Sequence, residues 1–162
     1  MRGIVTSPVL RGLRVLRDVP GAVLEGVVTV KEPWARLEVL HAANYEPKFE
    51  RDPPRYPKAI WEPLLAGTAL PALRELELSP PMHDSGFTAC SDLWASPLAK
   101  RLQKITARWL RPWDVAHWYT DLREKARGQT YVVDLGRFVF KPVNGELSEL
   151  AVGAVGGAYQ NL

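Results

Sequence analysis

Leucines recur in an uneven rhythm within residues 69–79, ALPALRELELS. They lie at Leu70, Leu73, Leu76 and Leu78, at steps of three, three and two residues. A helix would repeat its apolar positions every ~3.6 residues and a strand every second residue, so neither period fits alone. The steps instead predict a turn at Leu73 that leads into a short strand, whose inward side chains are Leu76 and Leu78.

The same arrangement of three apolar positions recurs elsewhere along the chain. Clear copies begin at Leu37, in LEVLHA, and at Leu102, in LQKITA. Weaker copies begin at Leu13, in LRVLRD, and at Thr130, in TYVVDL. Together with Leu73, these first positions are 24, 36, 29 and 28 residues apart, which predicts five units of similar construction.

A second similarity supports a periodic chain and does not depend on those positions. Residues 7–16, SPVLRGLRVL, and residues 96–105, SPLAKRLQKI, share a Ser-Pro start followed by apolar residues at the same offsets. The two serines are 89 residues apart, close to three units of about 29 residues. The two segments are therefore interpreted as copies of one unit.

The repeated pattern resembles the leucine-rich repeat family, in particular units of about 28 or 29 residues like those of the ribonuclease-inhibitor type. The resemblance covers roughly residues 7–136. It implies an α/β fold: a short solenoid with parallel strands on the concave face and helices on the convex face. The chain departs from the family at the ninth position of the unit, where asparagine is usual. That position holds Gly21, Tyr45, Pro81, Leu110 and Phe138, so the repeats are degenerate.

Three segments between the strand patterns are predicted to be helical. Residues 58–67, KAIWEPLLAG, form a short helix with Pro63 in an irregular first turn and Gly67 at its end. Residues 91–101, SDLWASPLAKR, continue an apolar helical face. Residues 114–127, DVAHWYTDLREKAR, begin at a capping aspartate and end before Gly128.

The two ends of the repeat region differ. Residues 137–152, RFVFKPVNGELSELAV, contain Asn144-Gly145 between apolar runs, which predicts a β-hairpin that caps the solenoid. Residues 1–152 are thus expected to form a single domain, followed by a Gly/Ala-rich tail at 153–162. No polar cap precedes Leu10 and Leu13; another subunit covers this edge, or the chain belongs to a longer solenoid, or the first repeat is frayed.

Composition narrows the functional class. Cys90 is the single cysteine of 162 residues, which excludes an internal disulfide and zinc sites built from four cysteines or from two cysteines and two histidines. Arginines interrupt the apolar residues of the N-terminus, and no apolar run is long enough to span a membrane, so a cytoplasmic protein is expected. Usage rich in Arg, Ala, Pro and Leu indicates a bacterial origin.

Charge disfavours nucleic acid as the main partner. The net charge is +3, and both signs are interspersed along the chain. The most basic stretch, residues 99–111, is interpreted as the solvated side of a repeat, with a nucleic-acid site as the alternative. Catalysis at His83-Asp84-Ser85 or Cys90 is disfavoured, because neighbouring residues point in different directions. No nucleotide or metallopeptidase motif is present, so no cofactor or metal is expected.

Two surfaces are candidates for protein recognition. The first is residues 44–57, NYEPKFERDPPRYP, an excursion with the aromatic and arginine side chains that are common in interfaces; a tolerated insertion that packs on neighbouring units is the alternative. Its candidate binding residues are Tyr45, Phe49, Arg51, Arg55 and Tyr56. The second comprises outward side chains of the predicted strands: Glu38, His41, Arg74, Glu75, Glu77, Gln103 and Lys104. Val39 and Thr106 are also expected to point outward.

The sequence predicts a non-enzymatic protein–protein interaction module, a subunit or regulator in a larger bacterial assembly. Charges of both signs on the predicted concave face suit a protein partner better than a phosphate backbone. The alternatives are an inhibitor or immunity-type protein that blocks a toxin or enzyme, and a nucleic-acid-binding accessory protein.

Overall fold

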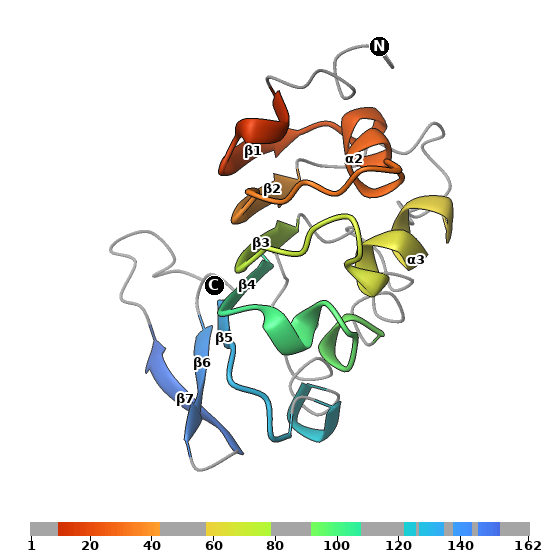
Figure 1. Ribbon diagram of the computed structural model, residues 1–162. Coiled ribbons are helices and arrows are strands. Elements are labelled where there is room, and N and C mark those ends of the chain that lie inside the picture. Colours follow the sequence, from red (N-terminus) through yellow and green to blue (C-terminus); the bar gives the residue numbers. More distant parts are fainter. Residues whose placement is uncertain are drawn as a thin grey trace, which may run out of the picture.

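The computed structural model describes residues 10–42, 58–78, 92–107, 122–125, 127–134, 138–143 and 146–152. These residues form an α/β structure in which a mostly parallel sheet packs against helices on one side (Figure 1). Seven strands within these ranges pair in the order in which they occur along the chain. They are β1 (Val15–Val19), β2 (Val39–Ala42), β3 (Glu75–Leu78), β4 (Lys104–Ala107), β5 (Val132–Asp134), β6 (Phe138–Val143) and β7 (Glu146–Val152).

The first five strands are parallel, and their register follows the spacing of the sequence pattern. One row of paired residues runs across all five strands, and each of its members lies two residues after the first position of its predicted unit. The row consists of Val15, Val39, Glu75, Lys104 and Val132. The five predicted starting positions therefore give the strand register.

The same backbone contact joins successive units just before each strand. The carbonyl oxygen of Arg14 accepts from the amides of Glu38 and Val39, at 2.8 and 3.0 Å. The Glu38 carbonyl accepts from Arg74 and Glu75 at the same two distances. The pattern recurs at the Arg74 carbonyl, which accepts from Gln103 at 2.7 Å and from Lys104 at 3.1 Å. One carbonyl with two donors thus joins the second, third and fourth units each to the unit before, while the Gln103 carbonyl accepts from Val132 at 2.8 Å.

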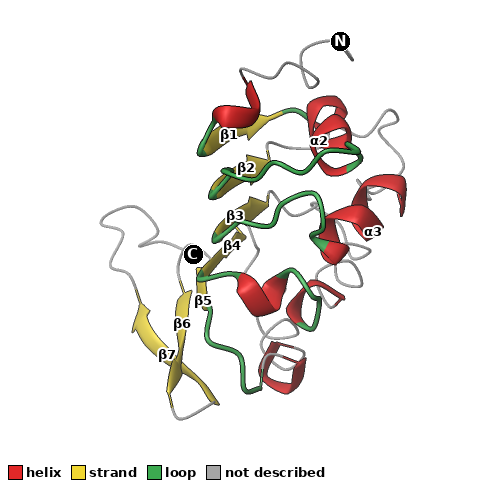
Figure 2. Ribbon diagram, viewed as in Figure 1, coloured by secondary structure: helices red, strands yellow, loops and turns green. Residues whose placement is uncertain are grey.

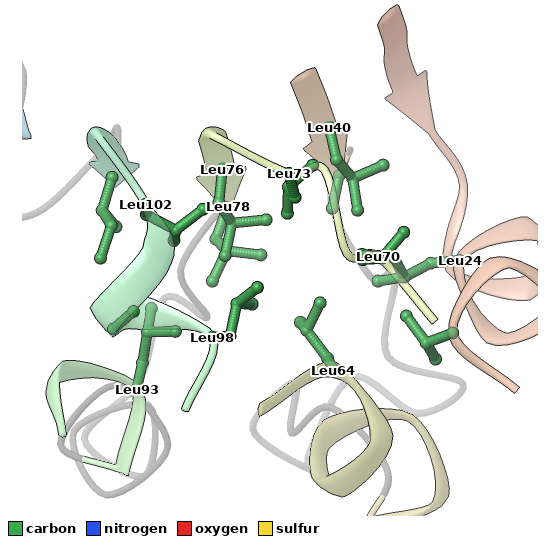
Figure 3. Packing of buried hydrophobic residues seen from close by; sticks show 14 of the residues in the cluster. Leu24, Leu40, Leu64, Leu70, Leu73, Leu76, Leu78, Leu93, Leu98 and Leu102 are labelled. Atoms are coloured by element: carbon green, nitrogen blue, oxygen red, sulfur yellow. The ribbon is translucent and has the colours of Figure 1, made fainter. Parts of the chain in front are cut away.

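The core lies between the sheet and the helices (Figure 3). Leu40, Leu76 and Ile105 point inward from equivalent positions of three strands, and each is at most 1% exposed. The first leucines of the units stack beside them, with Leu37 at 0% and Leu73 at 2% exposure. Full burial of one such side chain stabilises a fold by about 1.5–3 kcal/mol, so the recurring leucines account for much of the core.

Helix α3 (Lys58–Ala66) agrees with the prediction for residues 58–67. Ile60 and Leu64 are buried, but Pro63 lies inside the helix rather than in its first turn. Gly67 ends the helix with φ +65, in the left-handed region where glycine carries no steric penalty. Its carbonyl accepts a hydrogen bond from the Arg101 guanidinium at 2.7 Å, and a Cβ at position 67 would collide with the same guanidinium.

Helix α2 (Gly21–Val28) was not among the predicted helices. Its sequence, GAVLEGVV, contains two glycines and begins after Pro20, whose side chain makes no capping hydrogen bond. The usual helix-start signals are therefore missing. The Pro20 carbonyl accepts from the amide of Leu24, and the helix is held by burial of Leu24, Val27 and Val28 against the core.

The predicted continuous helix over residues 91–101 is wrong. Residues 92–94 are helical, and a separate 3-10 helix, η2 (Ala99–Arg101), follows a bend. Pro97 explains the break, because the residue before a proline is pushed out of helical conformation. Ser96 is buried, and its hydroxyl oxygen accepts from the Ala99 amide at 3.0 Å, so it starts the new turn. Leu93 and Leu98 remain buried as predicted.

The Ser-Pro segments have matching structures where both are described. The 3-10 helix η1 (Leu10–Gly12) and η2 each have three residues, and their first residues are 89 positions apart. Strands β1 and β4 also begin 89 positions apart, at Val15 and Lys104. The structure thus supports the interpretation of these segments as copies.

The helix predicted at residues 114–127 falls mostly outside the described residues. Residues 122–125 are helical, with Leu122 fully buried. Gly128 has φ +78, as a helix-ending glycine requires. No helix in the described ranges is both long and apolar enough to cross a membrane.

The first unit departs from the predicted pattern. Leu13 is 36% exposed, although its equivalents in the next three units are buried. Asp18 does not take the third inward position; it is exposed and has φ 53. The register shifts between Leu16 and Val19, so Val19 instead points into the core at 4% exposure. This β-bulge keeps a carboxylate out of an apolar site.

The last parallel unit also differs. Thr130, its predicted first position, is exposed, and Tyr131 fills the core at 1% exposure. The Tyr131 hydroxyl donates to the backbone carbonyl of Trp94 at 3.0 Å, which satisfies its polar end. Burial raises the pKa of this hydroxyl well above its usual value, because the charged phenolate would lose its hydration.

Strands β6 and β7 form an antiparallel pair within the segment predicted to be a hairpin, residues 137–152. Strand β6 also pairs antiparallel with β5, so it closes the edge of the parallel strands at that end (Figure 2). The predicted turn residues, Asn144 and Gly145, and the predicted tail at 153–162 lie outside the described residues.

Leu73 and Leu13 offer a direct comparison, because they hold the same position of two units. Leu73→Ala should lower the free energy of unfolding by about 2–5 kcal/mol, since it leaves a cavity at a site that is 2% exposed. Leu13→Ala should cost less than about 1 kcal/mol, because its side chain is already partly in water. Urea denaturation of the two variants measures both values; equal losses would contradict the assignment.

Tyr131 should make the protein sensitive to alkaline pH. Below pH ~10 both the folded and the unfolded hydroxyl are neutral; above it the unfolded tyrosine ionises while the folded one resists. The free energy of unfolding should therefore fall as pH rises above ~10. Tyr131→Phe should lose about 1 kcal/mol at neutral pH and show a shallower alkaline decline. Denaturation curves from pH 8 to ~11 would overturn this if both proteins declined alike.

Candidate functional site

The sheet carries a second face, opposite the buried leucines, whose side chains alternate with them along each strand. We call this the outer face and define it by two rows of residues and the residues just before the strands. The first row is Val15, Val39, Glu75, Lys104 and Val132, and the second is His41, Glu77, Thr106 and Asp134. Arg17 of β1 is also exposed, but it lies in the β-bulge between Leu16 and Val19, outside the regular register. Arg14, Glu38, Arg74 and Gln103 precede strands β1 to β4. All seven strand residues predicted to bind a partner lie in this set.

Glu38 is held by Arg14 of the preceding unit. The Arg14 guanidinium donates from Nε and Nη2 to Oε1 at 3.1 and 2.7 Å, and from Nη2 to Oε2 at 2.9 Å. Hydrogen bonding to Glu38 and the charge of its carboxylate raise the pKa of Arg14. Both carboxylate oxygens of Glu38 therefore already accept hydrogen bonds from the same chain.

His41 and Glu77 face each other across β2 and β3, where they are register partners. The His41 Nδ1 lies 3.4 Å from the Glu77 carboxylate, and both side chains are about one-fifth exposed, at 22% and 19%. At this exposure a partner could reach only the edges of the two groups. Their position on the outer face agrees with the prediction, but their polar atoms meet one another.

Lys104 reaches along the face to Asp134, whose carboxylate lies 3.0 Å from its Nζ. The two residues are diagonal neighbours, because Lys104 pairs with Val132 and Asp134 lies two residues further along β5. Thr106 pairs with Asp134 on the outer face, as predicted, but it is only 5% exposed. The alternation of the strand fixes the direction of a side chain but not what covers it.

Three other predicted binding residues form an exposed part of the outer face. Arg74, Glu75 and Gln103 are exposed, and they lie together because the Gln103 amide donates to the Arg74 carbonyl at 2.7 Å. Within the described residues, no ion pair of less than 4 Å involves Arg74 or Glu75. This cluster combines a cation, a carboxylate and an amide at the entrance of β3 and β4. It can form directional hydrogen bonds to backbone and side-chain groups of a protein.

The prediction missed the residues that neutralise this face, Arg14 and Asp134, and the exposed residues of β1, Val15 and Arg17. A signal for them was available, because LRVLRD and TYVVDL were recognised as weak copies of the unit. Reading those copies in register with LEVLHA would have placed Val15 beside Val39 and Arg17 on the outward side of its strand.

The other predicted candidates either lie outside the described residues or make separate contacts within the chain. Tyr45, Phe49, Arg51, Arg55 and Tyr56 belong to the undescribed part of the chain, as do His83 and Cys90. In the basic stretch 99–111, Arg101 and Lys104 make different contacts within the chain. Arg101 donates to the carbonyl of Gly67, and Lys104 is paired on the outer face.

The residues that the structure describes contain no group of three or more His, Cys, Asp or Glu side chains that could hold a metal ion. Comparison with protein-family models, with curated proteins and with solved structures gives no match.

The Lys104–Asp134 pair should contribute modestly to stability. Its side chains are 41% and 23% exposed, so solvent screens much of the attraction. A double-mutant cycle with Lys104→Ala and Asp134→Ala should give a coupling energy of about 0.2–1 kcal/mol that decreases in about 1 M salt. Denaturation of the four proteins at two salt concentrations tests this; a coupling that salt leaves unchanged would show that the pair is not screened.

Proposed function

We propose that this chain is a non-enzymatic protein-binding module, built as a short leucine-rich repeat solenoid, that recognises another protein on its outer face. The support for the architecture is the register, because five units recognised by their apolar positions supply five parallel strands in the same phase. Stacked units of this kind create an extended surface that is suited to macromolecular partners.

The cluster of Arg74, Glu75 and Gln103 carries the functional proposal. Around it, the polar atoms of Glu38, His41, Glu77 and Lys104 contact other side chains of the chain, and Glu38 and Lys104 are neutralised by Arg14 and Asp134. The cluster itself is exposed and carries both signs of charge. Such a surface selects a partner by complementary charge and geometry, whereas a phosphate backbone would favour clustered cations. The module would act as a subunit or regulator of a larger bacterial assembly in the cytoplasm.

A charge swap on the outer face tests this function. The variant Arg74→Glu with Glu75→Arg keeps the net charge but reverses the local pattern. Its matched control is Lys58→Glu with Glu62→Lys on α3, which swaps an exposed ion pair of 3.2 Å on the helical side. Tagged forms of the three proteins are used to capture partners from a lysate of the source organism, and the captured protein is purified for calorimetry. Binding should weaken about tenfold or more in the outer-face variant and stay unchanged in the control.

Two results would refute the proposal. One is a partner that binds both variants like the original protein, which would place recognition elsewhere. The other is capture of nucleic acid with an affinity that falls steeply with salt, which would favour the nucleic-acid alternative. Alanine at Tyr45, Phe49 and Tyr56, tested in parallel, separates a contribution of the 44–57 segment from that of the outer face.

A further inference from the structure

Strand β1 is the end strand of the parallel part of the sheet, and its side chains are more exposed than their equivalents. Leu13 is 36% exposed, whereas Leu37, Leu73 and Leu102 of the following units are at 0%, 2% and 2%. Val15 is 45% exposed, whereas its row partners Val39 and Val132 are half-buried. Leu13 and Val15 are the two exposed large hydrophobic residues in the described part of the chain, and both belong to this unit.

The backbone contact that joins successive units has no counterpart on the outer edge of β1 among the described residues. In three successive units, the amides of two adjacent residues donate to one carbonyl of the unit before. Position for position, the corresponding amides of the first unit are those of Arg14 and Val15. They lie at the edge of the sheet where no earlier described strand pairs with β1. An edge of this kind is a template for strand addition.

We propose that an extended segment of another protein adds to β1 as a parallel strand. Its backbone carbonyl accepts from the amides of Arg14 and Val15, and an apolar side chain covers Leu13. The inference goes beyond the proposed function, because it uses the edge of the sheet rather than the cluster at Arg74. It follows from continuity, since the added strand repeats the interface that the chain itself forms three times.

Charge indicates the chemistry of the added segment. Arg17 is exposed and makes no ion pair with the described residues, while Arg11 is paired with Glu32 and Arg14 with Glu38. The Arg17 guanidinium follows the registered part of β1, so a carboxylate near the end of an added strand would lie close enough to pair with it. The segment is therefore apolar at its inward positions and acidic opposite Arg17.

The bulge at the end of β1 limits what can bind. Regular pairing is interrupted after Leu16, and Asp18 is exposed with a left-handed backbone. A second copy of the chain fits poorly, because a twofold axis that keeps both outer faces on one side makes the two β1 strands antiparallel. The repeated interface is parallel. A short acidic segment of a different protein is thus favoured over a dimer.

The probe is a synthetic peptide with the sequence of residues 72–79, ALRELELS. In the fold this sequence places leucines inward and Glu75 in the row that contains Val15, with Glu77 two residues further along in the direction of Arg17. Titrated into isotope-labelled protein, it should give saturable NMR shifts at the amides of Arg14 and Val15. A spin label at the peptide N-terminus should broaden signals near Leu13 rather than near Val19, as parallel addition requires.

Two variants of the protein sharpen the test. Val15→Pro removes one of the two donors and should abolish binding, while the fold persists because edge strands tolerate proline; the thermal unfolding temperature checks the fold. Arg17→Glu should weaken the acidic peptide about fivefold and instead favour a charge-reversed peptide, ALRKLKLS. Lys58→Glu, on exposed α3, should leave binding of both peptides unchanged.

Several outcomes would overturn the proposal: no saturable shift at a peptide concentration of about 1 mM, an antiparallel orientation, or binding that survives Val15→Pro. Concentration-dependent dimerisation of the peptide-free protein that Val15→Pro abolishes would assign the edge to a second copy instead. The charge swap at Arg74 and Glu75 should not affect peptide binding, so this proposal and the proposed function can fail separately.

Discussion

The parallel register of the first five strands is the constraint on which the rest of this structure depends. Each strand has only three to five residues, so it contributes few inward side chains and could not bury them alone. When Leu40, Leu76 and Ile105 are aligned, they form one continuous apolar row that α2 and α3 can cover. A shift of one residue in any strand would send its leucines outward and its charges into the core.

The same register creates the outer face. Arg14 meets Glu38, His41 meets Glu77, and Lys104 meets Asp134, although each pair spans units that are separated in sequence. These side-chain contacts are consequences of the backbone alignment rather than its cause, because partly exposed polar contacts add little stability. Their effect is to neutralise most of the face and to leave a small polar cluster accessible. Specificity would then reside in a few side chains on a firmly aligned support.

The strand phase was predictable because it depends on apolar spacing, which the sequence displays directly. The ends and breaks of the helices were not predictable in this way, because they depend on local backbone conformation and on burial. Helix α2 lacks a capping side chain and contains glycines, so tertiary burial of Leu24 decides its conformation. Pro97 divided a segment whose apolar pattern was compatible with one helix. On the candidate site, side-chain direction was predicted well, but pairing was not, since it requires the register between distant units.

The contact between Arg101 and Gly67 links two residues that are 34 positions apart. The guanidinium occupies the space that any side chain at position 67 would need, and the positive φ independently disfavours one. The end of α3 in one unit is therefore shaped by the entry to the strand of the next. Replacing the unit that carries Arg101 would remove the donor to the Gly67 carbonyl, so neighbouring units of this chain are matched to one another at this contact.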